Sequence, residues 1–369
     1  MSAPAESYDR EQFRKQFAAA YQALEKGIAE RAFPGCAFGV FANGQVLGID
    51  ALGRQTYDAD SPAITPDTVY DLASVSKVVA TTAAAMLLWQ RGGLDLDEPL
   101  AELMPGFIIG RDPAEKARTI TLRMLLAHSA GLPSYLYLYK TCDSPAALLR
   151  SLLTLPIETL PGTRSEYSDF GFILLGKAIE ILSGELLSSF AMREIFAPLG
   201  MLHTRFCPTA AERPQIPPTE EDKELRKRVI QGEVQDEHAW LLKGGAGHAG
   251  VFSNVADLLR FSEALLKPGT LFTAEAISTF SKRQVPPVAP EGSSRALGWD
   301  TPSEPSSSGK YFSPHSIGHL GFSGTSLWID MEIGVSVVLL TNRTWPDRKP
   351  EGIRAIRPIF HDAAREALK

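Results

Sequence analysis

Residues 68–92 have the sequence Thr-Val-Tyr-Asp-Leu-Ala-Ser74-Val-Ser-Lys77-Val-Val-Ala-Thr-Thr-Ala-Ala-Ala-Met-Leu-Leu-Trp-Gln-Arg-Gly, which places a serine at a predicted helix start. The residues before Ser74 are short and extended in character. Residues 78–90 are rich in Ala, Leu and Met and end before two glycines, which predicts a helix and its stop. Ser74 is therefore expected on the first turn, at the positive end of the helix dipole. Lys77 shares the helix face that carries Ser74.

The spacing of Ser74 and Lys77 is the spacing of an activated nucleophile. A serine hydroxyl attacks carbonyl groups poorly unless a base removes its proton, and a desolvated lysine can be that base. The Ser-x-x-Lys pattern alone is weak, because residues 307–310 repeat it in a Pro/Ser-rich stretch with no helix behind it, where we expect a loop. On these four residues alone, a helix N-cap at Ser74 with a solvated Lys77 is the simpler interpretation.

Two segments further along the chain carry polar residues beside predicted elements. Tyr167-Ser168-Asp169 lies in a loop, by its Pro and Gly content, and feeds a predicted apolar helix over 170–182. His319-Leu320-Gly321 leads into residues 322–330, whose aromatic and β-branched content predicts a strand. Taken singly, Tyr167 is expected to be a packing residue with a solvated hydroxyl, and His319 a turn residue.

Together, these segments resemble the serine β-lactamase/penicillin-binding-protein superfamily, above all its class C β-lactamases, D-Ala-D-Ala carboxypeptidases and family VIII esterases. The family motif Ser-x-x-Lys corresponds to residues 74–77. The motif Tyr-x-Asn corresponds to residues 167–169 except at its last position, and Lys/His-Thr-Gly corresponds to residues 319–321 except at its middle. The resemblance spans residues 33–345, and three flanking runs also look familial: 125–132, 196–201 and 244–252.

The resemblance implies a role for each motif. Ser74 would be the acylated nucleophile, and Lys77 and Tyr167 would share its proton and pass one to the leaving group. The oxyanion hole would be formed by the backbone N–H groups of Ser74 and Phe322, one at a helix start and one at a strand edge. The remaining motif positions are implied to bind substrate: Asp169, His319, Leu320 and Gly321. The predicted function is hydrolysis of an ester, an amide or a β-lactam through an acyl-Ser74 intermediate.

Three departures from the family pattern affect this prediction. Asp169 stands where the family has Asn, and a carboxylate near Lys77 favours the protonated lysine and weakens it as a base. His319 replaces the lysine common in β-lactamases, and a neutral histidine attracts substrate carboxylates less. Leu320 lacks the hydroxyl that usually binds that carboxylate. The last two changes favour esters or uncharged acyl substrates, and we expect hydrolysis to rise above neutral pH as Lys77 loses its proton.

Two other functions stay open on the sequence. A penicillin-binding sensor would be acylated at Ser74 without turnover, because Asp169 and His319 could make deacylation slow. A non-catalytic scaffold is disfavoured, because packing alone does not require Ser74, Lys77 and Tyr167 together.

Other patterns in the chain give weaker evidence of function. Residues 245–250 fit G-x-G-x-x-G, but no convincing strand precedes them, so a nucleotide site is disfavoured and the resemblance makes them a tight loop at the cleft. The seven histidines are scattered and no H-E-x-x-H occurs, so neither a metal nor another cofactor is predicted. For residues 236–238 (Asp-Glu-His) a place at the rim of the cleft is an alternative, but a polar loop is the simpler expectation. The acidic run 220–224 is expected to be a solvated linker.

Composition restricts the class of protein. The chain has 369 residues, 44% of them hydrophobic, which is enough for a large core and more than one lobe. A net charge of −6 gives no basic surface for nucleic acid or anionic membrane. The expected partner is the one that the resemblance implies, a small-molecule acyl substrate. The oligomeric state is not determined. The cysteines form no disulfide or metal pattern and are expected to be buried free thiols: Cys36, Cys142 and Cys207.

Targeting signals are not evident. No stretch is long and apolar enough to span a bilayer. Residues 1–10 lack the basic-then-apolar order of a signal peptide. The sequence therefore favours the cytoplasm, and a periplasmic location would follow if a signal peptide had been removed.

Strand and helix patterns predict an α+β fold. Residues 7–32 have a one-sided helix pattern, and Asn43-Gly44 joins a hairpin of 36–42 and 45–52. A second strand pair (324–329 and 334–340) and a helix (352–368) follow near the other end. We predict an antiparallel sheet flanked by terminal helices in residues 1–73 and 245–369, with residues 74–244 forming an inserted all-helical lobe. The active site would lie in the cleft between the lobes.

Overall fold

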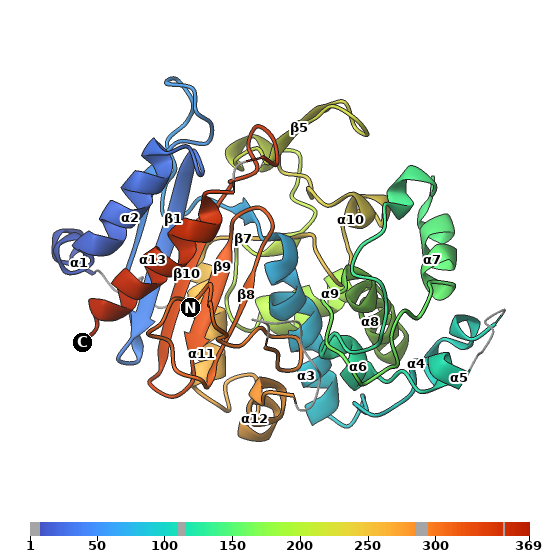
Figure 1. Cartoon of the computed structure of the whole chain (residues 1–369). Coiled ribbons are helices and arrows are strands. Elements are labelled where there is room, and N and C mark those ends of the chain that lie inside the picture. Colours follow the sequence, from blue (N-terminus) through green and yellow to red (C-terminus); the bar gives the residue numbers. More distant parts are fainter. Residues whose placement is uncertain (1–7, 110–114, 285–293, 350) are drawn as a thin grey trace.

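A sheet built from both ends of the chain organises the computed structural model, which describes residues 8–109, 115–284, 294–349 and 351–369. Within these residues the main sheet has five antiparallel strands in the order β2-β1-β10-β9-β8 (Figure 1). The strands are β1 (Gly35–Ala42), β2 (Gln45–Gly53), β8 (Ser316–Leu320), β9 (Ser326–Asp330) and β10 (Val335–Thr341). The predicted α+β class with an antiparallel sheet is confirmed.

The hairpin of β1 and β2 has the turn that its sequence predicts. Asn43 and Gly44 have φ values of 54° and 77°. A two-residue hairpin with both central residues at positive φ matches the right-handed twist of the flanking strands. The sequence pattern therefore locates this turn correctly and sets the register of the first two strands.

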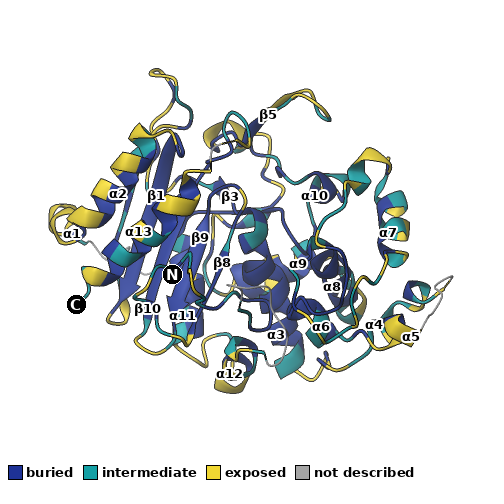
Figure 2. Cartoon of the chain, in the orientation of Figure 1, coloured by how far each residue is buried: buried dark blue, intermediate teal, exposed yellow. Residues whose placement is uncertain are grey.

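Strand β1 is buried on both faces, and its alternate residues pack against different layers. Phe38 and Val40 belong to the smaller core cluster with the terminal helices, and Ala37 and Phe41 belong to the larger cluster. Gly39 lies on the second face, where an added Cβ would be 2.6 Å from Val255 Cγ1. The sheet is thus a middle layer between helices (Figure 2).

Three helices from the chain ends cover one face of the sheet: α1 (Arg10–Gln16), α2 (Ala18–Ala29) and α13 (Ile353–Glu366). The predicted helix over 7–32 is divided at Phe17, whose φ and ψ of −97° and 24° interrupt the helix. In α13 the buried positions include Ile353, Ile356 and Phe360, which repeat at helical spacing and face α2 and the sheet. Helix α11 (Val255–Leu266) covers the other face.

Most of the remaining described elements lie on the side of the sheet away from α1, α2 and α13, beyond the edge strand β8 (Figure 1). The helices among them include α3 (Ala83–Gln90), α4 (Leu100–Leu103), α5 (Glu115–Arg118), α6 (Leu122–Leu126), α7 (Pro145–Leu153), α8 (Asp169–Ser183), α9 (Leu187–Ala191), α10 (Glu237–Leu241) and α12 (Ala274–Ser281). The short strands are β3 (Tyr70–Asp71), β4 (Arg205–Phe206), β5 (Glu220–Asp222), β6 (Arg228–Ile230) and β7 (Val251–Ser253). None of the described helices is both long and apolar enough to cross a membrane.

The predicted insertion at 74–244 is mainly helical, but it also contains β4, β5 and β6. Strands β5 and β6 pair with each other, and β4 pairs with β7 of the following segment. The larger core cluster contains side chains from both sides of the predicted boundaries, such as Phe41 and Leu87. The division into two lobes therefore stays a prediction.

The glycine-rich segment 244–250 packs directly on helix α8. A Cβ on Gly247 would lie 2.1 Å from the Phe172 carbonyl oxygen, and a Cβ on Gly176 would lie 2.9 Å from the Gly247 Cα. Only glycine at both positions allows the two backbones this approach. The loop and the helix are therefore held at one fixed distance.

We predict that Gly247→Ala lowers the free energy of unfolding by about 1–3 kcal/mol, because the added methyl group must displace the backbone of α8. Equilibrium unfolding in denaturant measures the effect. Gly245→Ala is the matched control in the same loop, because its Cβ would meet only the Ser188 side chain, at 3.8 Å. Equal stability of the two variants would contradict the prediction.

Candidate active site

A pocket of about 590 Å³ gathers most of the residues that the sequence singles out. Lys77 and His319 lie behind its wall, with almost no exposed surface. The residues of the three motifs that line the pocket are Ser74, Tyr167, Asp169, Leu320 and Gly321, together with Phe322. Segments that are separated by up to about 250 residues of sequence therefore meet in one cavity.

Ser74 lies on a tight turn between strand β3 and the helix that continues as α3. The turn is a 3-10 segment (Ala73–Val75), followed by a π-helical segment (Lys77–Thr82). Ala73 has φ of 46°, a conformation that L-residues rarely adopt. Its N–H donates to Asp71 Oδ1 at 2.9 Å, which fixes the turn. Strain at this position directs the chain so that Ser74 reaches the pocket.

The Ser74 hydroxyl oxygen accepts two hydrogen bonds. Lys77 Nζ donates to it at 2.8 Å, and the Tyr167 hydroxyl donates to it at 2.8 Å. A nucleophile in contact with two groups that can exchange protons is the arrangement needed for covalent catalysis. The N-cap interpretation with a solvated Lys77 is wrong, because the lysine side chain is fully buried.

Lys77 has an acceptor for each of its three ammonium hydrogens. Besides Ser74 Oγ, Nζ donates to Asp169 Oδ1 at 2.6 Å and to the His248 carbonyl oxygen at 3.0 Å. Burial lowers the pKa of Lys77, and the Asp169 carboxylate opposes that shift. Asp169 occupies the first turn of α8, where the helix dipole favours a negative charge. The contact between Lys77 and Asp169 is the one expected from the replacement of the family's Asn.

Tyr167 is enclosed by aromatic rings and cations. Its ring centroid lies 4.6 Å from that of His128 and 6.1 Å from that of His319. Lys77 Nζ lies 4.9 Å from the Tyr167 centroid, and the guanidinium carbon of Arg295 lies 5.1 Å from it. Burial raises the pKa of Tyr167 well above its usual range, and Arg295 opposes that shift. The expectation of a solvated tyrosine hydroxyl is wrong, since the hydroxyl is bonded to Ser74.

His319 lies within strand β8, one residue before its end, and is not a turn residue. Its Nδ1 lies 2.8 Å from the Leu320 carbonyl oxygen, to which it donates. Burial lowers the pKa of His319 to about 4, so the ring is neutral at physiological pH. The strand predicted over 322–330 begins only at Ser326 (β9), because the Gly321 N–H donates to the Thr325 carbonyl at 2.8 Å and closes a turn.

The turn 321–325 is tied to the strand that precedes Ser74. The Ser323 hydroxyl donates to the Asp71 carbonyl at 2.8 Å, and the Thr325 hydroxyl donates to the Leu72 carbonyl at 2.9 Å. These two bonds hold the backbone around Phe322 at a set distance from the Ser74 turn. The two backbone segments expected to form an oxyanion hole are therefore joined directly.

Arg357 of α13 holds the same turn from the other side. Its Nη2 donates to the carbonyl oxygens of Gly321 at 2.8 Å and Thr325 at 2.9 Å. Because a trans peptide group is planar, a Gly321 carbonyl directed at Arg357 turns the Phe322 N–H in the opposite direction. Arg357 therefore fixes the orientation of one expected oxyanion donor, a function that its sequence context does not reveal.

Asp236 and Glu237 line the pocket, as the alternative of a cleft rim has it, and they start helix α10 where the simpler expectation was a polar loop. Asp236 Oδ1 caps helix α10 and lies 2.7 Å from His248 Nε2. Burial alone would raise the pKa of Asp236, but His248 lowers it below the usual range. The His248 carbonyl in turn accepts from Lys77, so Asp236 is connected to the candidate base through one residue.

The acidic run 220–224 is not a solvated linker at its first residue. Glu220 is buried in strand β5 and accepts two hydrogen bonds from Arg348, at 2.6 and 2.8 Å. Arg348 also donates to Glu237 at 2.7 Å. These ion pairs join β5, α10 and the segment after β10, and two of their members, Glu237 and Arg348, line the pocket.

One wall of the pocket is rich in arginine. Burial and the neighbouring Arg343 and Arg354 lower the pKa of Arg357 to about 9, which leaves Arg357 charged at neutral pH. The lining also carries Asp169, Asp236 and Glu237, of which Glu237 is paired with Arg348. The arginines can bind an anionic group of a ligand. The arginines of the pocket are Arg343, Arg348, Arg354 and Arg357.

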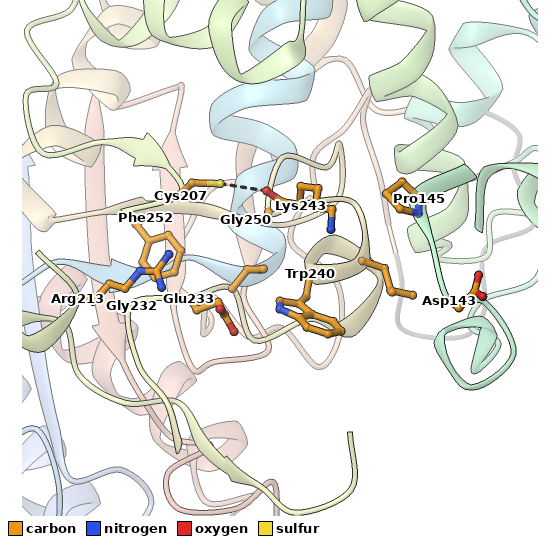
Figure 3. A pocket seen from close by; sticks show the side chains of 13 residues that line it. Asp143, Pro145, Cys207, Arg213, Gly232, Glu233, Trp240, Lys243, Gly250 and Phe252 are labelled. Atoms are coloured by element: carbon orange, nitrogen blue, oxygen red, sulfur yellow. Dashed lines mark hydrogen bonds between the residues drawn. The ribbon is translucent and has the colours of Figure 1, made fainter. Parts of the chain in front are cut away.

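A second pocket, of about 290 Å³, contains none of the three motifs (Figure 3). Cys207 lies on its wall, is exposed, and donates from Sγ to the Lys243 carbonyl at 3.2 Å. The expectation of buried thiols holds for Cys36 and Cys142 and is wrong for Cys207, which follows β4 in a left-handed turn with φ of 52°. In the described part of the chain, no group of three or more His, Cys, Asp or Glu side chains is arranged to hold a metal ion.

Solved structures share this fold. EstCE1, a hydrolase with promiscuous acyltransferase activity, has a TM-score of 0.77 at 21% identity, covering 95% of this chain and 99% of that chain. A class C β-lactamase from Rhodobacter sphaeroides has a TM-score of 0.71 at 22% identity, covering 95% of this chain and 99% of that chain. At these identities the similarity establishes the fold alone.

Sequence relatives are closer. An N-acetylmuramyl-L-alanine amidase of Bacillus subtilis is 30% identical over 361 residues, covering 87% of this chain and 80% of the relative. A putative D-alanyl-D-alanine carboxypeptidase of Escherichia coli K12 is 32% identical over 309 residues, covering 76% of this chain and 70% of the relative. The protein-family model described as Beta-lactamase matches residues 20–359. The chain therefore belongs to the β-lactamase family of serine hydrolases.

Proposed function

We propose that this protein hydrolyses an amide, ester or β-lactam bond through a covalent acyl-Ser74 intermediate. One observation carries the proposal: the Ser74 hydroxyl lies in the wall of a 590 Å³ pocket and contacts both Lys77 Nζ and the Tyr167 hydroxyl at 2.8 Å. Neither contact is needed to fill the core, and together they supply the base that a serine nucleophile requires.

The proposed reaction has two stages. Lys77 and Tyr167, having lost one proton between them, take the proton of Ser74 Oγ as that oxygen attacks the substrate carbonyl. The negative charge on the carbonyl oxygen is bound by the N–H groups of Ser74 and Phe322. Tyr167 passes a proton to the leaving group, and a water molecule then attacks the acyl-enzyme with the same groups acting as base.

The substrate that this pocket favours carries an anionic group. His319 is neutral and Leu320 has no hydroxyl, and on the sequence these residues favour uncharged acyl donors. Arg354 and Arg357 supply positive charge to the same pocket from helix α13, which removes the reason for that preference. The relatives named as an amidase and as a putative D-alanyl-D-alanine carboxypeptidase support a peptide amide with a free carboxylate.

We predict Ser74-dependent turnover of a chromogenic cephalosporin, a chromogenic short-chain ester or a D-Ala-D-Ala peptide. Ser74→Ala should lower kcat about a thousandfold or more, because no other group forms the acyl intermediate. Steady-state assays on all three substrates measure this. Ser307→Ala, in the second Ser-x-x-Lys sequence, is the matched control and should leave turnover unchanged.

A stalled sensor would give a different result in the same experiment. Intact-mass measurement would then show one stable acyl group on Ser74 after incubation with a β-lactam, without steady-state turnover of any substrate. No label on Ser74 and no turnover would contradict both functions.

We predict that Arg354→Gln lowers kcat/KM for a D-Ala-D-Ala peptide about threefold to tenfold, because a substrate carboxylate loses a charged partner. The same peptide with a C-terminal amide is the control and should be affected little. Measuring kcat/KM for both peptides with both proteins gives the difference directly. An equal fall for the two peptides would contradict a role in carboxylate binding.

We predict that Asp169→Asn moves the acidic limb of the kcat/KM profile to lower pH by about one pH unit or more. Asp169 raises the pKa of both Lys77 and Tyr167, so its neutral replacement lets this pair lose its shared proton at lower pH. A pH series with the substrate that is turned over best measures the shift. Asp97→Asn, which removes a surface carboxylate paired with Arg123, should leave the limb in place. An acidic limb that stays in place or moves to higher pH in Asp169→Asn would contradict the assignment of Lys77 and Tyr167 as the groups that share the reactive proton.

A further inference from the structure

Arg295 lies next to Tyr167 of the candidate active site, although none of the three motifs includes it. Its side chain is 13% exposed, and its guanidinium carbon lies 5.1 Å from the centroid of the Tyr167 ring. It forms an ion pair with Asp300, across a turn in which the Ala296 N–H donates to the Trp299 carbonyl at 2.9 Å. Asp300 is also joined to Gly318 of β8 by two backbone hydrogen bonds of 2.9 Å, so the pair is anchored to the sheet beside His319.

The charged groups around Tyr167 form two ion pairs. Lys77, 4.9 Å from the ring centroid, is paired with Asp169 at 2.6 Å, and Arg295 is paired with Asp300. Burial lowers the pKa of both neighbouring histidines, so neither supplies a positive charge. The groups that face Tyr167 are Ser74, Lys77, His128, Asp169, Arg295, Asp300 and His319.

We propose that Arg295 is a positioning residue of this site: it acts through Tyr167, stabilising the negative charge that the phenol oxygen carries just before it takes the proton of Ser74. The inference rests on the proposed function above. The family position that often holds a lysine is occupied here by the neutral His319, and Arg295 is a second cation near the Tyr167 ring, 5.1 Å from its centroid, besides Lys77.

The proton balance of this step is closed. In the reactive form Lys77 keeps its three hydrogens, which its three acceptors bind, and the missing proton is that of Tyr167. The Ser74 O–H bond then breaks and the Tyr167 O–H bond forms as the serine oxygen attacks. A cation about 5 Å from the ring favours the phenolate and therefore the reactive form.

Asp300 has the opposite effect on the same oxygen. Its carboxylate neutralises part of the Arg295 charge, and it raises the pKa of Tyr167 where Arg295 lowers it. Arg295 and Asp300 are therefore expected to move the pH dependence of the reaction in opposite directions. A purely structural pair would not do this, because loss of either partner would then damage the site in the same way.

The test compares Arg295→Gln, Arg295→Lys and Asp300→Asn with the wild-type protein, each checked for folding by thermal unfolding. In Arg295→Gln the acidic limb of the kcat/KM profile should move to higher pH by about one pH unit. In Arg295→Lys it should keep its position, and in Asp300→Asn it should move to lower pH. Equal losses in all three variants with no movement of the limb would overturn the proposal. An acidic limb that moves to higher pH in Asp300→Asn would overturn the proposal as well.

The rate of Ser74 labelling by a fluorophosphonate, followed by intact mass across the same pH range, repeats the test without turnover. Labelling depends on activation of the nucleophile and not on deacylation. Labelling with the expected shifts, but without hydrolysis of any substrate, would refute the proposed function and support the role of Arg295. Ser74 that is never labelled would refute both.

Discussion

The ammonium group of Lys77 is the point on which the site depends. A buried amine is costly unless its hydrogens are bound, and here the three acceptors come from three segments of chain: the Ser74 turn, the start of α8 and the glycine-rich loop. A different local feature positions each segment. The Ser74 turn is positioned by the strained conformation of Ala73, Asp169 by its place at the N-terminus of α8, and the glycine-rich loop by its close packing against α8. The amine therefore fixes the relative positions of elements that share no sequence proximity.

The third side of the pocket is fixed by neutral acceptors and one arginine. The turn 321–325 is bonded through side-chain hydroxyls to the strand before Ser74, and through its carbonyls to Arg357 of the last helix. Because Arg357 forms no ion pair with a carboxylate of the described residues, its charge is held by backbone dipoles alone. The Arg357 side chain thereby connects helix α13 to the turn 321–325 in the wall of the candidate site.

The sequence predicts what is encoded locally. The Asn43-Gly44 hairpin, the helix after Ser74 and the three motifs follow from short-range chemistry and are present. The missed features depend on partners that are far away in the sequence. Glu220 can be buried because it pairs with Arg348, 128 residues further along the chain. Arg295 becomes a candidate for a role in the site only because the fold places it next to Tyr167. His319 was expected in a turn because a single histidine close to a glycine carries no strand pattern. The structure places it in strand β8, where it pairs with Leu327 of β9.

The sheet order also has a consequence for the synthesis of the protein. Strand β1 pairs with β10, so residues 35–42 lack one neighbour until residue 341 has been made. The apolar edge of β1 is thus open while almost the whole chain is translated, and contacts of such long sequence separation form slowly. During that time the edge is a site for association with other nascent chains or for capture by a chaperone. The turn that carries Ser74 is bonded to the turn 321–325, which is also synthesised late, so this part of the pocket is assembled only when translation is nearly finished.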